Sequence, residues 1–117
     1  MDIIHAAKCA HEAIREWNES IMDFSVVPWD EAPQNIKDSA IDGVKYLIAN
    51  PNATGKDMHD NWIKFKLADG WRYGPEKNAA AKTHPSLVPY DKINAHERMK
   101  DDIFISVVRG RLAVQNF

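Results

Sequence analysis

Apolar side chains recur along the first part of the chain at steps of three and four residues, which places them on one face of an α-helix. This pattern predicts a helix over residues 2–20, with Asp2 as its N-cap. Residues 24–28 fit an extended connection better, because the position before Pro28 is disfavoured in helical geometry. The apolar face comprises Ile3, Ala7, Ala10, Ile14, Trp17 and Ile21, and the opposite face carries His5, Cys9, Glu12 and Glu16.

Two further helices are predicted in the middle of the chain. The first begins around residues 30–33, where two carboxylates and a proline suit a first helical turn, and ends at residues 50–52. The second begins at a capping pair, Thr54 and Asp57, and ends at Gly70, a typical left-handed residue after a helix. Apolar positions of the first are Ile36, Ala40, Ile41, Val44, Leu47 and Ile48, and the second runs through Met58, Trp62 and Phe65.

An irregular stretch separates these helices from a last one. Residues 71–75 alternate aromatic with small or polar side chains, 76–82 resemble an exposed loop, and 83–90 contain two prolines. Asn94 and Glu97 form a second capping pair, and Gly110 is expected to weaken or end the helix that they open, with a fraying tail over 111–117. Its inward positions are Met99, Ile103, Phe104, Val107 and Val108.

These elements predict a mainly α fold: a small bundle of about four helices with an irregular or short strand-like connection. No internal repeat is evident. The chain of 117 residues suits one domain that buries roughly two-thirds of its unfolded surface. Its single cysteine, Cys9, excludes an internal disulfide and favours a reducing compartment. No apolar run approaches the roughly 20 residues of a membrane span, and no signal-peptide pattern opens the chain, so we expect a cytoplasmic protein without a membrane partner.

Charge is distributed unevenly along the chain, although the net charge is only −2. Residues 1–60 carry 5 basic and 11 acidic side chains, whereas residues 61–117 carry 10 basic and 6 acidic ones. The basic second part favours an anionic partner. Its excess is too small, in a chain that is acidic as a whole, to indicate a nucleic-acid-binding protein.

Three segments of the second part resemble the ryanodine-receptor (RyR) repeat domain family. They are His59-Asp60-Asn61-Trp62 followed by Lys64, then Gly70-Trp71-Arg72-Tyr73-Gly74, and then His84-Pro85-Ser86-Leu87-Val88-Pro89-Tyr90. Pro28-Trp29 and residues 39–44 resemble the first part of the same pattern, so the resemblance covers about residues 20–108. One departure is Asp60, which stands where a glutamate is common. The resemblance implies a single RyR-like domain over 1–117, with an extra N-terminal helix at about 2–20 and a repeat core at about 21–110, as in stand-alone microbial or phage members.

The resemblance implies a small helical fold and no channel. In the receptors the repeats form tandem pairs with pseudo-twofold symmetry, and such pairs are associated with adenine nucleotides. Microbial and phage members have been suggested to recognise nucleotide-like ligands. The resemblance also places a ligand-stacking tryptophan at Trp62, in the third predicted helix.

Aromatic and basic side chains concentrate between residues 62 and 90. Aromatic rings can stack on a planar ligand, and neighbouring cations can bind phosphate or carboxylate. The alternative is that Trp71, Tyr73 and Tyr90 only pack around the irregular connection, that His84 orders its turn, and that Lys64 and Lys66 are solvated. An open pocket beside Trp62 would favour the first interpretation. The candidate ligand-binding residues are Trp62, Lys66, Trp71, Tyr73, Lys82, His84 and Tyr90.

Catalytic and metal-binding patterns are not found in the sequence. His5 and Cys9 share a helix face, but the second cysteine and the ligand spacing of a zinc site are missing. Cys9 and His11 do not face one another as a nucleophile and base would, and carboxylates such as Asp101 and Asp102 look like surface charges. We therefore expect no enzyme, no metal and no cofactor.

The sequence leaves two hypotheses. The first is a non-catalytic binding module for a small anionic ligand, nucleotide-like, in which Trp62 stacks on the ligand. The alternative is a protein–protein interaction or assembly module, a homodimer, in which the aromatic cluster is only structural.

Overall fold

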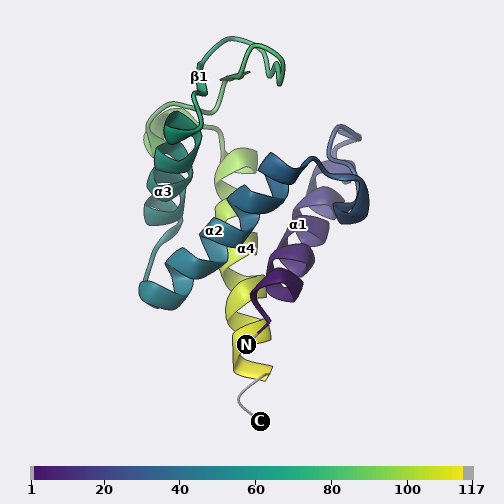
Figure 1. Ribbon diagram of the computed structural model, residues 1–117, viewed down its shortest axis with the longest axis vertical. Coiled ribbons are helices and arrows are strands. Elements are labelled where there is room, and N and C mark those ends of the chain that lie inside the picture. The colour runs from purple at the N-terminus through teal and green to yellow at the C-terminus, as the bar shows by residue number, and fades with distance from the viewer. Residues whose placement is uncertain (1, 115–117) are drawn as a thin grey trace.

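The computed structural model describes residues 2–114 and contains four α-helices with one small pair of strands (Figure 1). This arrangement confirms the predicted mainly α fold. The elements are α1 (Ile3–Glu19), a 3₁₀ turn η1 (Trp29–Glu31), α2 (Gln34–Ala49), α3 (Gly55–Ala68), β1 (Arg72–Tyr73), β2 (Thr83–His84), a 3₁₀ turn η2 (Tyr90–Lys92) and α4 (Ala95–Val114).

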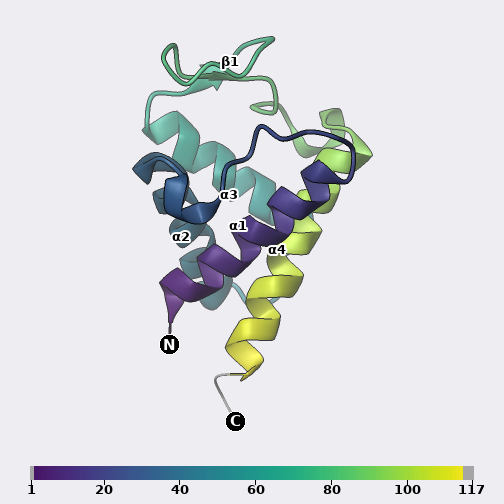
Figure 2. The same cartoon turned by 90° about the vertical axis from the view of Figure 1, so that its right-hand side faces the viewer.

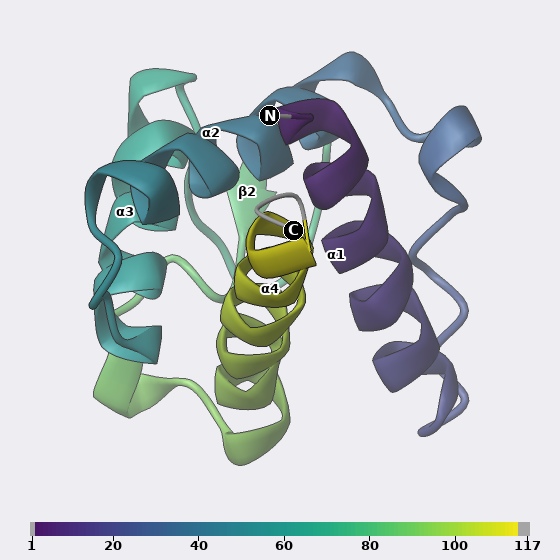
Figure 3. The same ribbon diagram turned by 90° about the horizontal axis from the view of Figure 1, so that it is seen from below.

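The helices pack as a bundle in which α1 and α3 lie on either side of α4 (Figure 3). Helix α2 packs against both α1 and α3. The core lies where the helices meet, at the fully buried Val44 of α2 and Val108 of α4. Three fully buried alanines of α1, at positions 6, 7 and 10, have side chains small enough to let the neighbouring helices approach closely.

The predicted helix ends are largely confirmed. Asp2 caps α1 by accepting a hydrogen bond from the backbone N–H of His5 at 2.9 Å. Thr54 and Asp57 form a complete capping box at the start of α3. Gly70 adopts the left-handed conformation, with φ of 86°, directly after the C-cap of α3.

Other predictions about the helices are wrong. Helix α4 continues through Gly110 to Val114, because the burial of Val108 and the packing of Leu112 outweigh the roughly 1 kcal/mol by which a glycine weakens a helix. Residues 111–114 are therefore helical, and 115–117 lie outside the described residues. Met99 and Ile21, both predicted to face inward, are 41% and 58% exposed.

The strands β1 and β2 pair in parallel, with Arg72 opposite Thr83 and Tyr73 opposite His84. They confirm the predicted strand-like connection. Figure 2 shows this connection lying beyond the end of α3, away from the rest of the bundle. Gly74 allows the close approach of the two segments, because a Cβ atom there would lie 2.6 Å from the Cβ of Thr83.

The structure also contains an internal repeat, which corrects the expectation that there is none. The unit α1–η1–α2 is matched by the unit α3–η2–α4. A proline precedes each 3₁₀ turn with nearly the same backbone angles, φ −54° and ψ 149° at Pro28 and φ −54° and ψ 150° at Pro89. Each proline follows a valine whose carbonyl oxygen accepts a hydrogen bond from a histidine Nε2 of the preceding helix, at 2.7 Å in both halves.

The aromatic residue of each 3₁₀ turn is covered by a cation in the same way. Lys37 Nζ lies 5.8 Å from the ring centre of Trp29, and the Arg98 guanidinium carbon lies 5.7 Å from that of Tyr90. Short sequence matches accompany this geometry: KCAHE at 8–12 and KDMHD at 56–60, and VPWD at 27–30 and VPYD at 88–91. Positions in α1 and α3 thus correspond at a spacing of 48, and positions in α2 and α4 at 61.

The two halves meet through unequal side chains at one pair of corresponding positions. Gly43 of α2 corresponds to Phe104 of α4, and a Cβ atom on Gly43 would lie 2.9 Å from the tip of the Phe104 ring. The ring of one half therefore occupies the space that the glycine of the other half leaves open. The halves are related structures that have diverged in what they place between them.

Candidate functional site

A cleft of about 470 Å³ opens between the two halves of the repeat. Its lining draws on α1, α2, α3 and α4, on the connection before η1, and on the loop between the strands. Many lining residues occupy corresponding positions. The pairs are His11 and His59, Ile14 and Trp62, Ser25 and Ser86, Ala32 and Ile93, Ile36 and Glu97, Ser39 and Lys100, Ala40 and Asp101, and Gly43 and Phe104.

The chemistry of the cleft differs between its two sides. The first half contributes small and apolar side chains such as Ile14, Ile36 and Ala40. The second half places Trp62, Glu97 and Asp101 at the corresponding positions. The polar recognition groups of the cleft therefore come mainly from the second half.

Trp62 is half-buried and lines the cleft from α3. Two histidine rings hold it: His59 lies 5.6 Å away at 27° to the indole plane, and His84 lies 5.1 Å away at 78°. His59 is fixed in turn by its hydrogen bond to the carbonyl oxygen of Val88. An indole held in place at a cleft wall can stack on a planar ligand without losing much side-chain freedom on binding.

Lys66 lies one helical turn beyond Trp62 and is only 3% exposed. The expectation that it is a solvated surface charge is therefore wrong. Its Nζ atom lies 4.7 Å from the ring centre of Trp71, and no carboxylate among residues 2–114 forms an ion pair with it. Burial, followed by the neighbouring charge of Lys77, lowers the pKa of Lys66. The cleft thus contains a cation whose charge is not neutralised by a carboxylate partner.

His84 links the strand connection to the cleft. Its Nδ1 accepts a hydrogen bond from the backbone N–H of Ser86 at 3.0 Å, so the neutral ring carries its proton on Nε2. Burial, followed by the charges of Lys77 and Lys66, lowers the pKa of His84 to about 4. At neutral pH the ring is uncharged and its Nε2 is a hydrogen-bond donor. The residue orders its turn, as one interpretation of the sequence expected, and lines the cleft as well.

Two carboxyl groups of α4 line the cleft, and they differ in their partners. Glu97 forms an ion pair with Lys100 at 3.0 Å. Asp101 has neither a hydrogen bond nor an ion pair in the described part of the chain. Burial, together with the charges of Asp102 and Glu97, raises the pKa of Asp101 to about 7. The prediction that Asp101 is a surface charge is therefore wrong, whereas its neighbour Asp102 is exposed.

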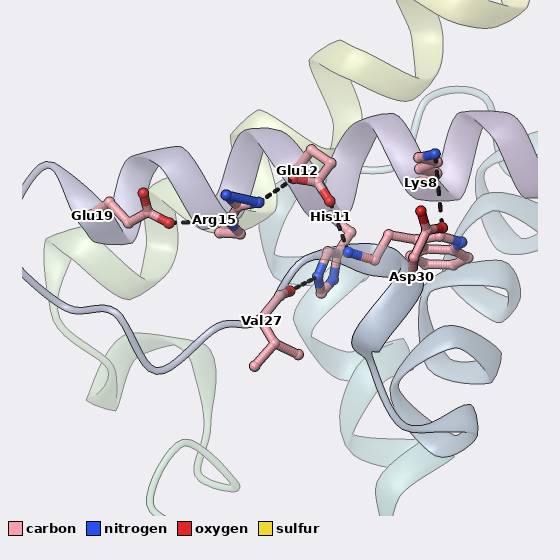
Figure 4. Close-up of polar contacts among 8 residues, drawn as sticks. Lys8, His11, Glu12, Arg15, Glu19, Val27 and Asp30 are labelled. Atoms are coloured by element: carbon pink, nitrogen blue, oxygen red, sulfur yellow. Dashed lines mark hydrogen bonds and ion pairs between the residues drawn. The ribbon is translucent and has the colours of Figure 1, made fainter.

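One wall of the cleft is a connection that α1 holds in place (Figure 4). His11 donates from Nε2 to the carbonyl oxygen of Val27, and Glu12 accepts the backbone N–H of Trp29 at 2.8 Å. That hydrogen bond lowers the pKa of Glu12. Arg15 orients the same carboxylate at 2.8 Å and also contacts Glu19 at 3.0 Å. Helix α1 therefore positions residues 25–27, which line the cleft.

Four of the seven candidate ligand-binding residues come together at this cleft, namely Trp62, Lys66, Trp71 and His84. The structure places the other three elsewhere. Tyr73 is 59% exposed in β1. Lys82 donates to the carbonyl oxygen of Asp69 at 2.7 Å, which directs it to the end of α3. Tyr90 packs its hydroxyl against Gly55 at the start of α3.

Sequence reasoning missed the residues that the repeat brings to the cleft, above all His11, Lys100 and Asp101. The signal for their arrangement is the pair of matched segments around His11 and His59 and around Pro28 and Pro89. Because the strand connection lengthens the second half, the spacing of these matches changes from 48 to 61, and a fixed period does not show them.

Two further features of the described residues concern other kinds of site. Within residues 2–114, no three histidine, cysteine or acidic side chains lie close enough to hold a metal ion together. None of the helices over that range is both long and apolar enough to cross a membrane.

Comparison with known protein families identifies the chain. The model of the RyR domain matches residues 32–108, which include α2, α3, both strands and most of α4. This match covers about two-thirds of the 117 residues and contains Trp62, Lys66, His84 and Asp101. The chain therefore belongs to the RyR domain family.

Proposed function

We propose that this protein is a non-catalytic binding module for a small anionic ligand with a planar ring, of the nucleotide type. The observation that supports the proposal is the combination of a positioned indole, Trp62, and a buried cation without a carboxylate partner, Lys66, in one cleft. A planar ring stacks on the indole, and a phosphate or carboxylate pairs with the ammonium group.

The cleft suits such a ligand in size and charge. A volume of about 470 Å³ is within the range of small-molecule sites. Lys77 lines it together with Lys66, and neutral His84 adds a donor that does not require charge. An anion in this position offsets the cost of burying Lys66, which water no longer solvates fully.

Thermal unfolding in the presence of adenosine and guanosine 5′-monophosphates tests the proposal. A ligand at about 100 times its Kd raises the free energy of unfolding by about 2.7 kcal/mol, which gives a clear increase in Tm. Trp62→Ile is a suitable variant, because Ile14 occupies the corresponding position of the first half. We expect this variant to remain folded and to lose the increase. An unchanged Tm with both nucleotides, or an equal increase in Trp62→Ile, contradicts the proposal.

A second candidate function is assembly with another copy of this chain. The connection after α1 exposes three large apolar side chains, at 58% for Ile21, 76% for Met22 and 63% for Phe24. Such side chains gathered on one segment are typical of an interaction surface. Sedimentation velocity at two protein concentrations tests this function. A dimer that Phe24→Ser dissociates supports it, and a monomer at both concentrations contradicts it.

A further inference from the structure

Asp101 is the group in the cleft that binding of an anion does not explain. It lines the same cleft as Lys66 and Trp62, and its carboxyl group has no hydrogen bond or ion pair among residues 2–114. A carboxylate beside an anionic ligand opposes binding unless it contacts a different part of that ligand. Its presence indicates that the ligand offers a complementary group at this end.

The fold itself does not require a carboxyl group at this position. The corresponding residue of the first half is Ala40, which also lines the cleft in a helix with the same packing role. Buried residues on either side of the comparison agree, since Val44 and Leu47 of α2 correspond to Ile105 and Val108 of α4. The first half therefore shows that an alanine suffices structurally where the second half has Asp101.

The chemistry of a half-buried carboxyl group defines what it can bind. A carboxylate accepts hydrogen bonds through both oxygens, and the neutral acid accepts through one and donates through the other. An exocyclic amino group on a planar ring supplies an N–H donor, next to either a ring nitrogen acceptor or a ring N–H. A carbonyl oxygen in place of the amino group presents only an acceptor, which a carboxylate repels.

We propose that Asp101 is a specificity-determining residue that selects ligands whose planar ring carries an exocyclic amino group. This inference rests on the proposed function, since it assigns the ring to Trp62 and the anionic group to Lys66. The amino group then lies toward α4, at the acidic side of the cleft. Recognition is divided between a cation on α3 and a carboxyl group on α4.

Three nucleotides test this inference by calorimetric titration: adenosine, guanosine and inosine 5′-monophosphates. Inosine lacks the amino group of each of the other two rings. We expect the intact protein to bind at least one amino-bearing nucleotide roughly tenfold more tightly than inosine 5′-monophosphate, the ratio typical of one hydrogen bond to a charged group. Asp101→Ala, which installs the residue of the first half, should remove this preference. Asp102→Ala, a neighbouring acid that does not line the cleft, should retain it.

The possible failures are distinguishable. Equal affinity of the intact protein for all three nucleotides, with binding lost in Trp62→Ile, overturns the role of Asp101 and leaves the proposed function in place. A preference that survives in folded Asp101→Ala also overturns that role. No binding of any of the three nucleotides overturns both proposals. The comparison within the intact protein needs no variant, so it remains decisive if a substituted protein does not fold.

Discussion

Lys66 illustrates how a single residue can lower stability and support binding. Its ammonium group is buried over Trp71 without a carboxylate partner, and burial lowers its pKa. We expect Lys66→Met, which keeps the length of the side chain and removes the charge, to raise the free energy of unfolding by about 1 kcal/mol. The same variant should bind adenosine or guanosine 5′-monophosphate at least roughly tenfold more weakly. Urea unfolding and calorimetry measure the two effects.

Lys64→Met is the matched control for this prediction. Lys64 lies two residues earlier in α3, is exposed, and does not line the cleft. Its substitution should leave both the free energy of unfolding and the nucleotide affinity nearly unchanged. A loss of affinity in Lys64→Met equal to that in Lys66→Met would show that net charge, and not the buried ammonium group, governs binding.

Asp101 and His84 affect stability with opposite dependence on pH. The pKa of Asp101 is about 7 in the folded protein and about 3.8 when unfolded, so the folded state holds a proton that the unfolded chain releases between these values. Stability therefore falls as pH rises through this range. The pKa of His84 is about 4 when folded and about 6.5 when unfolded, so its contribution to stability rises with pH between these values.

Asp101→Asn separates the two contributions. At pH 8 the intact protein carries a half-buried charge that the variant lacks, so we expect the variant to be more stable by roughly 2–3 kcal/mol. This difference should vanish toward pH 4, where Asp101 is protonated. Between pH 4 and 6.5 the variant should gain stability as pH rises, through His84. Urea unfolding across this range checks the prediction, and a difference that does not depend on pH would refute it.

At the scale of elements, two glycines test opposite effects of the same substitution. A Cβ atom at Gly74 would lie 2.6 Å from the Cβ of Thr83, so Gly74→Ala should separate the strand pair and destabilise the protein by about 1–3 kcal/mol. Gly110 is exposed in α4 and has no atom within 4 Å of such a Cβ, so Gly110→Ala should stabilise the protein by about 0.5–1 kcal/mol.

Thermal or urea unfolding of the two variants measures both effects. Because the strand pair carries His84 into the cleft, Gly74→Ala should also weaken nucleotide binding, whereas Gly110→Ala should not change it. Equal stability of the two variants would contradict the close approach of the strand connection at Gly74.

The helix ends were predictable from the sequence because local groups determine them. Asp2 and the Thr54–Asp57 pair hydrogen-bond the first turns of their own helices, and Gly70 supplies a conformation that few other residues adopt. The continuation of α4 through Gly110 was not predictable in this way, because it depends on contacts of Val108 and Leu112 with distant helices.

At the scale of the whole molecule, the internal repeat explains where the cleft lies and why its sides differ. Corresponding positions meet between the halves, and the second half has replaced apolar lining with Trp62, Glu97 and Asp101. The aromatic part of the site was predictable, because the Gly70–Gly74 and His84–Tyr90 segments mark it. The roles of Lys66 and Asp101 were not, because their burial depends on how the two halves pack.

The four tryptophans of the chain allow the site to be located directly. Trp62 and Trp71 line the cleft, whereas Trp17 and Trp29 do not. Substitution of each tryptophan assigns its indole N–H resonance in a two-dimensional NMR spectrum, and titration with adenosine or guanosine 5′-monophosphate then follows all four. We expect a saturable shift that is largest for the Trp62 resonance, smaller for Trp71 and absent for Trp17 and Trp29. Saturable binding that shifts Trp17 or Trp29 while leaving Trp62 unchanged would contradict the cleft as the binding site.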